Sequence, residues 1–178
     1  MQQRGFTLME VLVAMALIMV AALGGMQLVS MAIEMMSQAR RQALATTLVS
    51  SRMEQLRALR FEFDSSGTRV TDTSADLTAD PPALGGPGLS PSGPLALDAN
   101  VPGYVDYLDA RGARVGAGAS PPAGAALVRR WAIEPADASG DLLVLQVLVR
   151  PLDGSIVPAG RRAAGEVRFA TLRARVRR

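Results

Sequence analysis

The sequence contains no cysteine, no histidine and no lysine among its 178 residues. Without cysteine it has no disulfide or thiolate chemistry, and without histidine it has no imidazole catalysis. Without lysine the phosphate-binding pattern GxxxxGK[ST] cannot occur. Carboxylates, hydroxyls and tyrosines remain for acid–base or nucleophilic chemistry, and no pair of carboxylates is placed for it. We therefore expect no enzyme, and no cofactor, metal or small-molecule substrate.

The basic residues are all arginines, and they are distributed unevenly along the chain. Residues 61–109 are acidic and contain only Arg69 as a basic residue, whereas residues 150–178 are rich in arginine. Two solvated surfaces explain this pattern, as does a contact with another subunit or an acidic partner. The ending "RFATLRARVRR" (168–178) could instead contact nucleic acid phosphates. It lacks the interleaved aromatics of a single-strand binder, so subunit contacts or a charged strand edge explain it better.

The segment 11–33 contains no charged residue. As a helix it measures about 35 Å, which is enough to cross the apolar core of a bilayer. Arg4 and the α-amino group precede it, so the positive-inside rule places the N-terminus in the cytoplasm. Glu10 lies beside this segment, and a carboxylate in lipid costs roughly 2.5–3.5 kcal/mol on insertion scales. We therefore expect the carboxylate of Glu10 to have a function that offsets this cost.

Three interpretations of this segment compete. It could be a secretory signal peptide, with "VAALGG" (20–25) as its cleavage site. It could be a simple membrane anchor, which leaves Glu10 unexplained. It could also insert first and then pack against copies of itself, where Glu10 meets a positive partner. The helical pattern continues well past residue 25, which counts against the signal peptide.

The stretch "RGFTLMEV" (4–11) resembles the class III signal of type IV pilins and type II secretion pseudopilins. In that family a short basic leader ends in glycine, phenylalanine follows, and a glutamate stands fifth after the cut. Gly5, Phe6 and Glu10 fill these places. The resemblance implies that a prepilin peptidase removes residues 1–5 and that Phe6 becomes an N-methylated terminus. It also implies that Glu10 meets the positive terminus of a neighbour during filament assembly.

A long helix is predicted from about residue 6 to about residue 60. Its first half (6–33) is apolar, and its second half (34–60) is amphipathic, as in the long pilin helix that the family possesses. The apolar stripe of the second half comprises Ala45, Leu48, Val49, Met53, Leu56 and Leu59. Charged residues lie largely off this stripe: Arg40, Arg41, Arg52, Glu54, Arg57 and Arg60. Gly24 and Gly25 either soften the helix or allow close packing against another helix.

The remaining residues, 61–178, predict a β-rich head with an α+β arrangement, in which the amphipathic helix half covers one face of a small antiparallel sheet. Residues 78–100 and 112–125 are rich in proline and glycine and are expected to be loops. Three or four strands are expected, from the segments 101–109, 126–135, 141–151 and 166–176, with 141–151 in the middle.

Two sets of residues in the head are candidates for a binding site. Trp131 could be a ligand platform, but a single tryptophan in a strand is expected to belong to the core, on one side with Leu127, Arg129 and Ile133. Asp106 and Asp109 could contribute to a cation site, although their spacing matches no loop with a defined ligand set. We expect neither to be a binding site.

The stretches "GFTLMEVLVAMALI" (5–18) and "ARRQALATTLVSSRMEQLRAL" (39–59) resemble the PilV type of minor type IV pilin. The resemblance implies a low-abundance inner-membrane subunit with a single pass and a periplasmic head, which primes pilus assembly or sits at the tip. Its partners would be the prepilin peptidase, other minor pilins and the major pilin, and it would end in a filament at the cell surface. A minor pseudopilin of type II secretion and a filament-borne DNA-binding or adhesive module are the alternatives.

Overall fold

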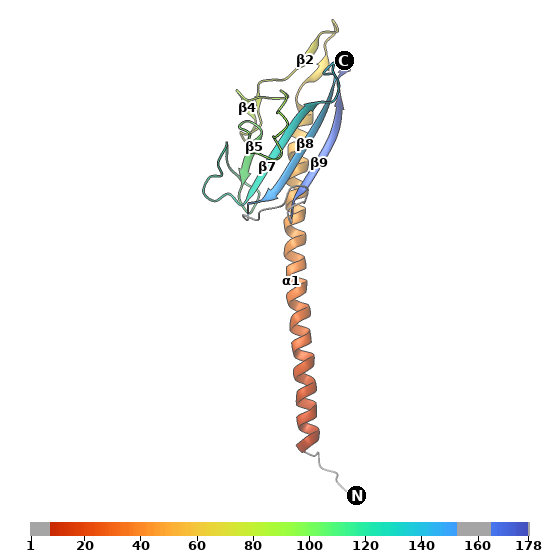
Figure 1. The fold of residues 1–178 in the computed structure, drawn as a ribbon, viewed down its shortest axis with the longest axis vertical. Coiled ribbons are helices and arrows are strands. Elements are labelled where there is room, and N and C mark those ends of the chain that lie inside the picture. The colour runs from red at the N-terminus through yellow and green to blue at the C-terminus, as the bar shows by residue number, and fades with distance from the viewer. Residues whose placement is uncertain (1–7, 153–164, 178) are drawn as a thin grey trace. The chain divides into compact units, whose positions relative to one another are not determined.

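The computed structural model describes residues 8–152 and 165–177. The chain divides into two units, an N-terminal unit (Met1–Arg40) and a head unit (Arg41–Arg178), which are described separately. Helix α1 runs from Leu8 to Ala58, close to the expected end at residue 60 (Figure 1). The expected start at residue 6 lies outside the described residues. The long helix and the antiparallel sheet confirm the predicted α+β class.

The main sheet has five strands in the order β6-β5-β7-β8-β9, and every neighbouring pair is antiparallel. The strands are β5 (Val105–Leu108), β6 (Arg114–Ala117), β7 (Leu127–Pro135), β8 (Leu142–Pro151) and β9 (Val167–Ala174). The four predicted strand segments correspond to β5, β7, β8 and β9. Strand β8 lies between β7 and β9, which confirms the prediction of a central strand for 141–151.

Two small sheets were not predicted. One has the order β10-β1-β2 and consists of β1 (Phe61–Phe63), β2 (Arg69–Thr71) and β10 (Val176–Arg177), with β10 parallel to β1. The other pairs β3 (Ala75–Asp76) with β4 (Ala83–Leu84). Strand β4 lies inside 78–100 and β6 inside 112–125, so the prediction of pure loops there was wrong. These strands are too short for an alternating pattern, and their pairing partners stabilise them.

The core of the head unit lies between α1 and one face of the main sheet. On α1, Ala45, Val49, Met53 and Leu56 are buried, as the predicted stripe requires. They belong to one apolar cluster with sheet residues that include Trp131, Ile133, Leu145, Val147 and Val149. Trp131 is fully buried, which confirms its assignment to the core. Figure 1 shows α1 passing behind β8 and β9 in the head.

Candidate functional site

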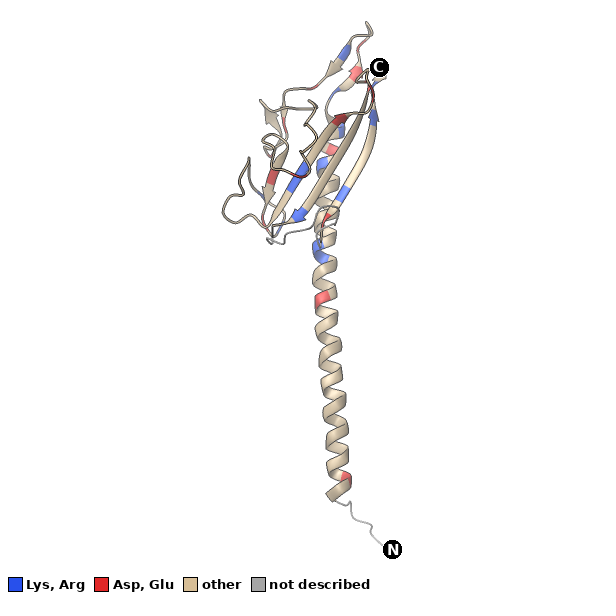
Figure 2. Cartoon of the chain, viewed as in Figure 1, with Lys and Arg blue, Asp and Glu red and all other residues tan. Residues whose placement is uncertain are grey.

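Part of the family motif lies in the described helix. Gly5 and Phe6 lie outside the described residues, whereas Glu10 lies in the first described turn of α1. A carboxylate near the N-terminus of a helix interacts favourably with the helix dipole. Between Glu10 and Glu34 the sequence has no charged residue, and the ribbon is tan there (Figure 2).

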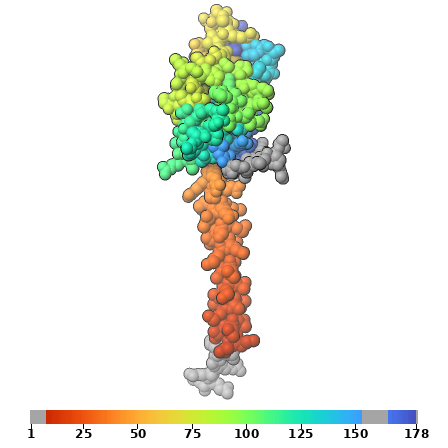
Figure 3. Space-filling model, turned by 60° about the vertical axis from the view of Figure 1, so that its left-hand side comes forward, coloured from red at the N-terminus to blue at the C-terminus, as the bar shows by residue number. Residues whose placement is uncertain are grey.

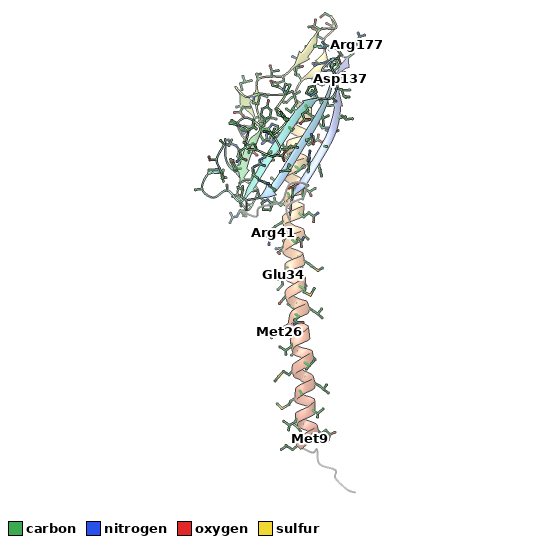
Figure 4. All side chains as sticks on the ribbon, viewed as in Figure 1. Met9, Met26, Glu34, Arg41, Asp137 and Arg177 are labelled. Atoms are coloured by element: carbon green, nitrogen blue, oxygen red, sulfur yellow. The ribbon has the colours of Figure 1, made fainter. Side chains whose placement is uncertain are left out.

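The apolar half of α1 exposes its side chains on all sides. Among the large apolar residues between Leu8 and Met36, the exposed fraction runs from 48% at Val11 to 80% at Leu8. Met9 and Met26 project away from the helix axis (Figure 4), and the space-filling view shows groups protruding along this stretch of the helix (Figure 3). The helix is long and apolar enough to cross a membrane. An apolar surface of this extent is stable against lipid or against other helices.

Gly24 and Gly25 lie within the unbroken α1. A Cβ atom added at either position would meet no atom within 4 Å, so no contact within the described chain requires glycine there. Close packing against a helix of another molecule and a softening of α1 both remain compatible with this geometry.

A buried ion cluster connects α1 to the main sheet inside the head unit. Arg52 donates a hydrogen bond from Nη2 to Asp106 Oδ2 over 2.6 Å. Arg129 donates to the same carboxylate through Nη2 (2.7 Å) and Nε (3.0 Å). Asp106 is fully buried, and Arg52 is 2% exposed. One carboxylate is therefore shared by two arginines from different elements, and the cluster retains a net positive charge.

Additional contacts orient the two guanidinium groups of this cluster. Arg52 also donates to the backbone carbonyl of Leu77, and its guanidinium lies 4.5 Å from the centroid of the Trp131 ring. Arg129 donates through Nη1 to the carbonyl of Leu48 over 3.3 Å. Burial, together with the repulsion from Arg129, lowers the pKa of Arg52 to about 10. Arg52 thus remains charged at neutral pH in a site that water does not reach.

The position of Arg52 corrects the sequence analysis, which placed it off the apolar stripe. It follows Val49 by three positions and precedes Leu56 by four, so it lies on the buried face of α1. The missed signal was Arg129, an arginine on the apolar side of its strand. A buried arginine needs a carboxylate, and Asp106 in the adjacent predicted strand was available.

Two arginines near the C-terminus bind groups within the head unit. Arg173 donates from Nη1 to Leu56 O over 2.8 Å, in the last turn of α1 where carbonyls lack helical partners, and from Nη2 to the carbonyl of Leu59 just after the helix. Arg175 stacks on the Phe61 ring at 4.0 Å and is hydrogen-bonded to Asp141 at 2.9 Å. Both side chains are thereby occupied, which weakens the case for nucleic acid binding by this segment.

The two aspartates considered for a cation site have different roles. Asp106 belongs to the ion cluster, whereas Asp109 Oδ1 accepts hydrogen bonds from the backbone amides of Arg111 and Ala113, both at 2.8 Å. Across residues 8–152 and 165–177, no group of three or more Asp or Glu side chains gathers at metal-binding distance. The geometry therefore does not support a shared cation site at these two residues.

Comparison with known proteins gives a match at the N-terminus. Residues 1–26 match the family model described as the prokaryotic N-terminal methylation motif. No curated protein and no solved structure matches the chain. The matched motif supports a type IV pilin-like prepilin, and it implies processing by a prepilin peptidase and association with the membrane.

Proposed function

We propose that this chain is a minor pilin subunit that takes part in priming or tip assembly of a type IV pilus. The observation that carries the proposal is the methylation motif over residues 1–26, continued by an exposed apolar helix and a folded head unit. A motif, an apolar helix and a folded head in this order suit a subunit that is first anchored in the inner membrane and later incorporated into a filament. The head would lie in the periplasm and the N-terminus in the cytoplasm.

Removal of residues 1–5 would leave a positive amine on Phe6, four residues before Glu10. In a bundle of apolar helices, the amine of one subunit and the carboxylate of the next would form an ion pair. A charge without a partner in such a medium is strongly unfavourable, so correct pairing would favour one axial register. This gives Glu10 a role in docking that offsets its insertion penalty of roughly 2.5–3.5 kcal/mol.

A minor pseudopilin of type II secretion is the second candidate, because the same methylation motif and helix serve both filaments. The internal hydrogen bonds of Arg173 and Arg175 favour either assembly role over a DNA-binding module. Deletion of the gene that encodes this chain distinguishes the two candidate functions. Loss of surface pili supports the minor pilin, and loss of protein secretion supports the minor pseudopilin.

The docking role is tested by Glu10→Ala in the full chain, with Glu34→Ala as the matched control at the other end of the charge-free stretch. We expect both variants to fractionate with membranes and to be processed. Only Glu10→Ala should fail to co-purify with partner subunits, and Glu10→Gln should fail as well if the charge is what matters. Co-purification of Glu10→Ala at the parental level would contradict the proposal.

A further inference from the structure

Strand β9 forms one edge of the main sheet. It pairs with β8 from Val167 to Ala174, and within residues 8–152 and 165–177 no second strand pairs with it. Backbone N–H and C=O groups on the open side of an edge strand are a template for an incoming strand. Strand β9 is eight residues long, which is enough for a stable register.

A groove of about 410 Å³ accompanies this edge inside the head unit. Its lining from α1 includes Met53, Glu54 and Arg57, and its lining from β9 includes Phe169 and Thr171. Phe169 is 38% exposed, so an aromatic face remains available there. A strand added to β9 would direct every second side chain toward this groove.

The opposite face of β9 is also apolar in its middle. It presents Ala170, Leu172 and Ala174, and Leu172 is 64% exposed beside its β8 partner Val144. Soluble proteins usually protect an edge strand with central charges or a proline. Here the charges lie toward the ends of the strand, at Arg168 and Arg173, so its middle is left open to pairing.

Charge decides between the possible occupants. The segment "VRFATLRA" contains arginines and no acidic residue, so two copies paired edge to edge would oppose like charges. An acidic strand would instead complement it. In the groove, Arg57 forms an ion pair with Glu54 at 3.3 Å, with both side chains at least half exposed, and donates a long hydrogen bond of 3.5 Å to Thr171 Oγ1.

We propose that β9 and its groove bind an extended segment of another protein, in which apolar and acidic residues alternate, by strand addition. Backbone hydrogen bonds to β9 would supply affinity, apolar side chains on the groove face would contact Phe169, and carboxylates on the opposite face would reach Arg168. The proposal concerns the head unit and stands whether or not the chain enters a filament.

The test uses the full chain in lipid nanodiscs and a short acetylated peptide of alternating valine and glutamate as the probe. Amide hydrogen exchange is followed across the head. We expect saturable protection confined to 167–174, and Arg168→Glu should weaken binding about fivefold, the loss expected for one exposed charge contact. Arg168→Lys should bind as the parent does. Arg114→Glu, on the opposite edge strand β6, is the matched control and should also leave binding unchanged.

Two further peptides complete the test. A valine–lysine peptide should give no protection, because its charges repel the arginines. A valine–glutamate peptide methylated on every backbone nitrogen should also fail, because it has no N–H group left to donate to β9. Absence of protection with the parent peptide, equal protection by the lysine peptide, or undiminished protection by the methylated peptide would each overturn the proposal.

Discussion

Asp106 is fully buried and is shared by two buried arginines, Arg52 and Arg129. We expect Asp106→Asn to lower the free energy of unfolding by about 3–5 kcal/mol, because two buried cations lose their counter-ion. Urea denaturation of a fragment comprising residues 34–178 measures this. Asp98→Asn, at an exposed position, is the control, and equal midpoints for the two variants would contradict the role of the cluster.

Asp141 is predicted to make the stability of the head depend on pH in the acidic range. The hydrogen bond from Arg69, assisted by that from Arg175, holds the pKa of its carboxyl below the usual 3.8. The unfolded chain therefore takes up this proton at a higher pH than the folded head does. The stabilisation is complete above about pH 4 and is lost as the pH falls through the lower folded-state pKa.

Urea midpoints measured from neutral pH down to about pH 3 test this dependence. Asp141→Asn should be less stable than the parent at neutral pH, and the difference should shrink in acid. A residual slope is expected from Asp64 and Asp137, whose pKa values are also lowered, chiefly by hydrogen bonds from Ser66 and Ser139. If the urea midpoints of Asp141→Asn and the parent differ by the same amount at every pH in this range, Asp141 does not contribute to the pH dependence of stability.

Arg52 illustrates why single buried charges were harder to predict than apolar residues. The apolar stripe of α1 follows from the 3.6-residue period, and Val49 and Leu56 are fully buried as predicted. The same period places Arg52 near that stripe. The pattern of the helix alone, however, cannot show that Asp106, in a strand distant in the sequence, pairs with Arg52. Long-range pairing of this kind depends on strand register, which the sequence alone leaves open.

The packing of α1 on the main sheet is tested by Leu56→Asp. Leu56 is fully buried in the apolar cluster, so an aspartate there would introduce an unpaired charge. We expect a loss of about 4 kcal/mol or more, enough to unfold most of the fragment 34–178. Ser51→Asp, on the exposed face of the same helix, should melt like the parent by circular dichroism. If Leu56→Asp and the parent melt at the same temperature, Leu56 does not pack between α1 and the main sheet as described.

Strand length explains which elements were predicted. Strands β7 and β8 have 9 and 10 residues with clear apolar runs, and the sequence predicted both. The two-residue strand β4 and the four-residue strand β6 lie in proline- and glycine-rich segments, where local propensity favours turns. Their structure comes from pairing, as in the contact of Ala75 with Leu84. Tertiary context therefore overrode local preference at these positions.

For the chain as a whole, the division into two units predicts that the head folds without the apolar helix half. We expect residues 34–178 to be soluble, to melt cooperatively and to show mixed helix and strand by circular dichroism. The full chain should instead require detergent or lipid, because its first helix half exposes large apolar side chains. A fragment that aggregates or lacks a cooperative transition would show that the head depends on the removed residues.

The mature N-terminus tests the prepilin interpretation most directly. The full chain is made in cells that contain a prepilin peptidase, recovered from their membranes and analysed by intact-mass and N-terminal mass spectrometry. Gly5→Ala should block processing, whereas Gln2→Ala and Gln3→Ala should be processed like the parent. The parent chain should begin at Phe6 and carry a methyl group on its terminal nitrogen. A chain that begins at Met1, or one cut after residue 22 as a secretory signal would be, would contradict the pilin-like function.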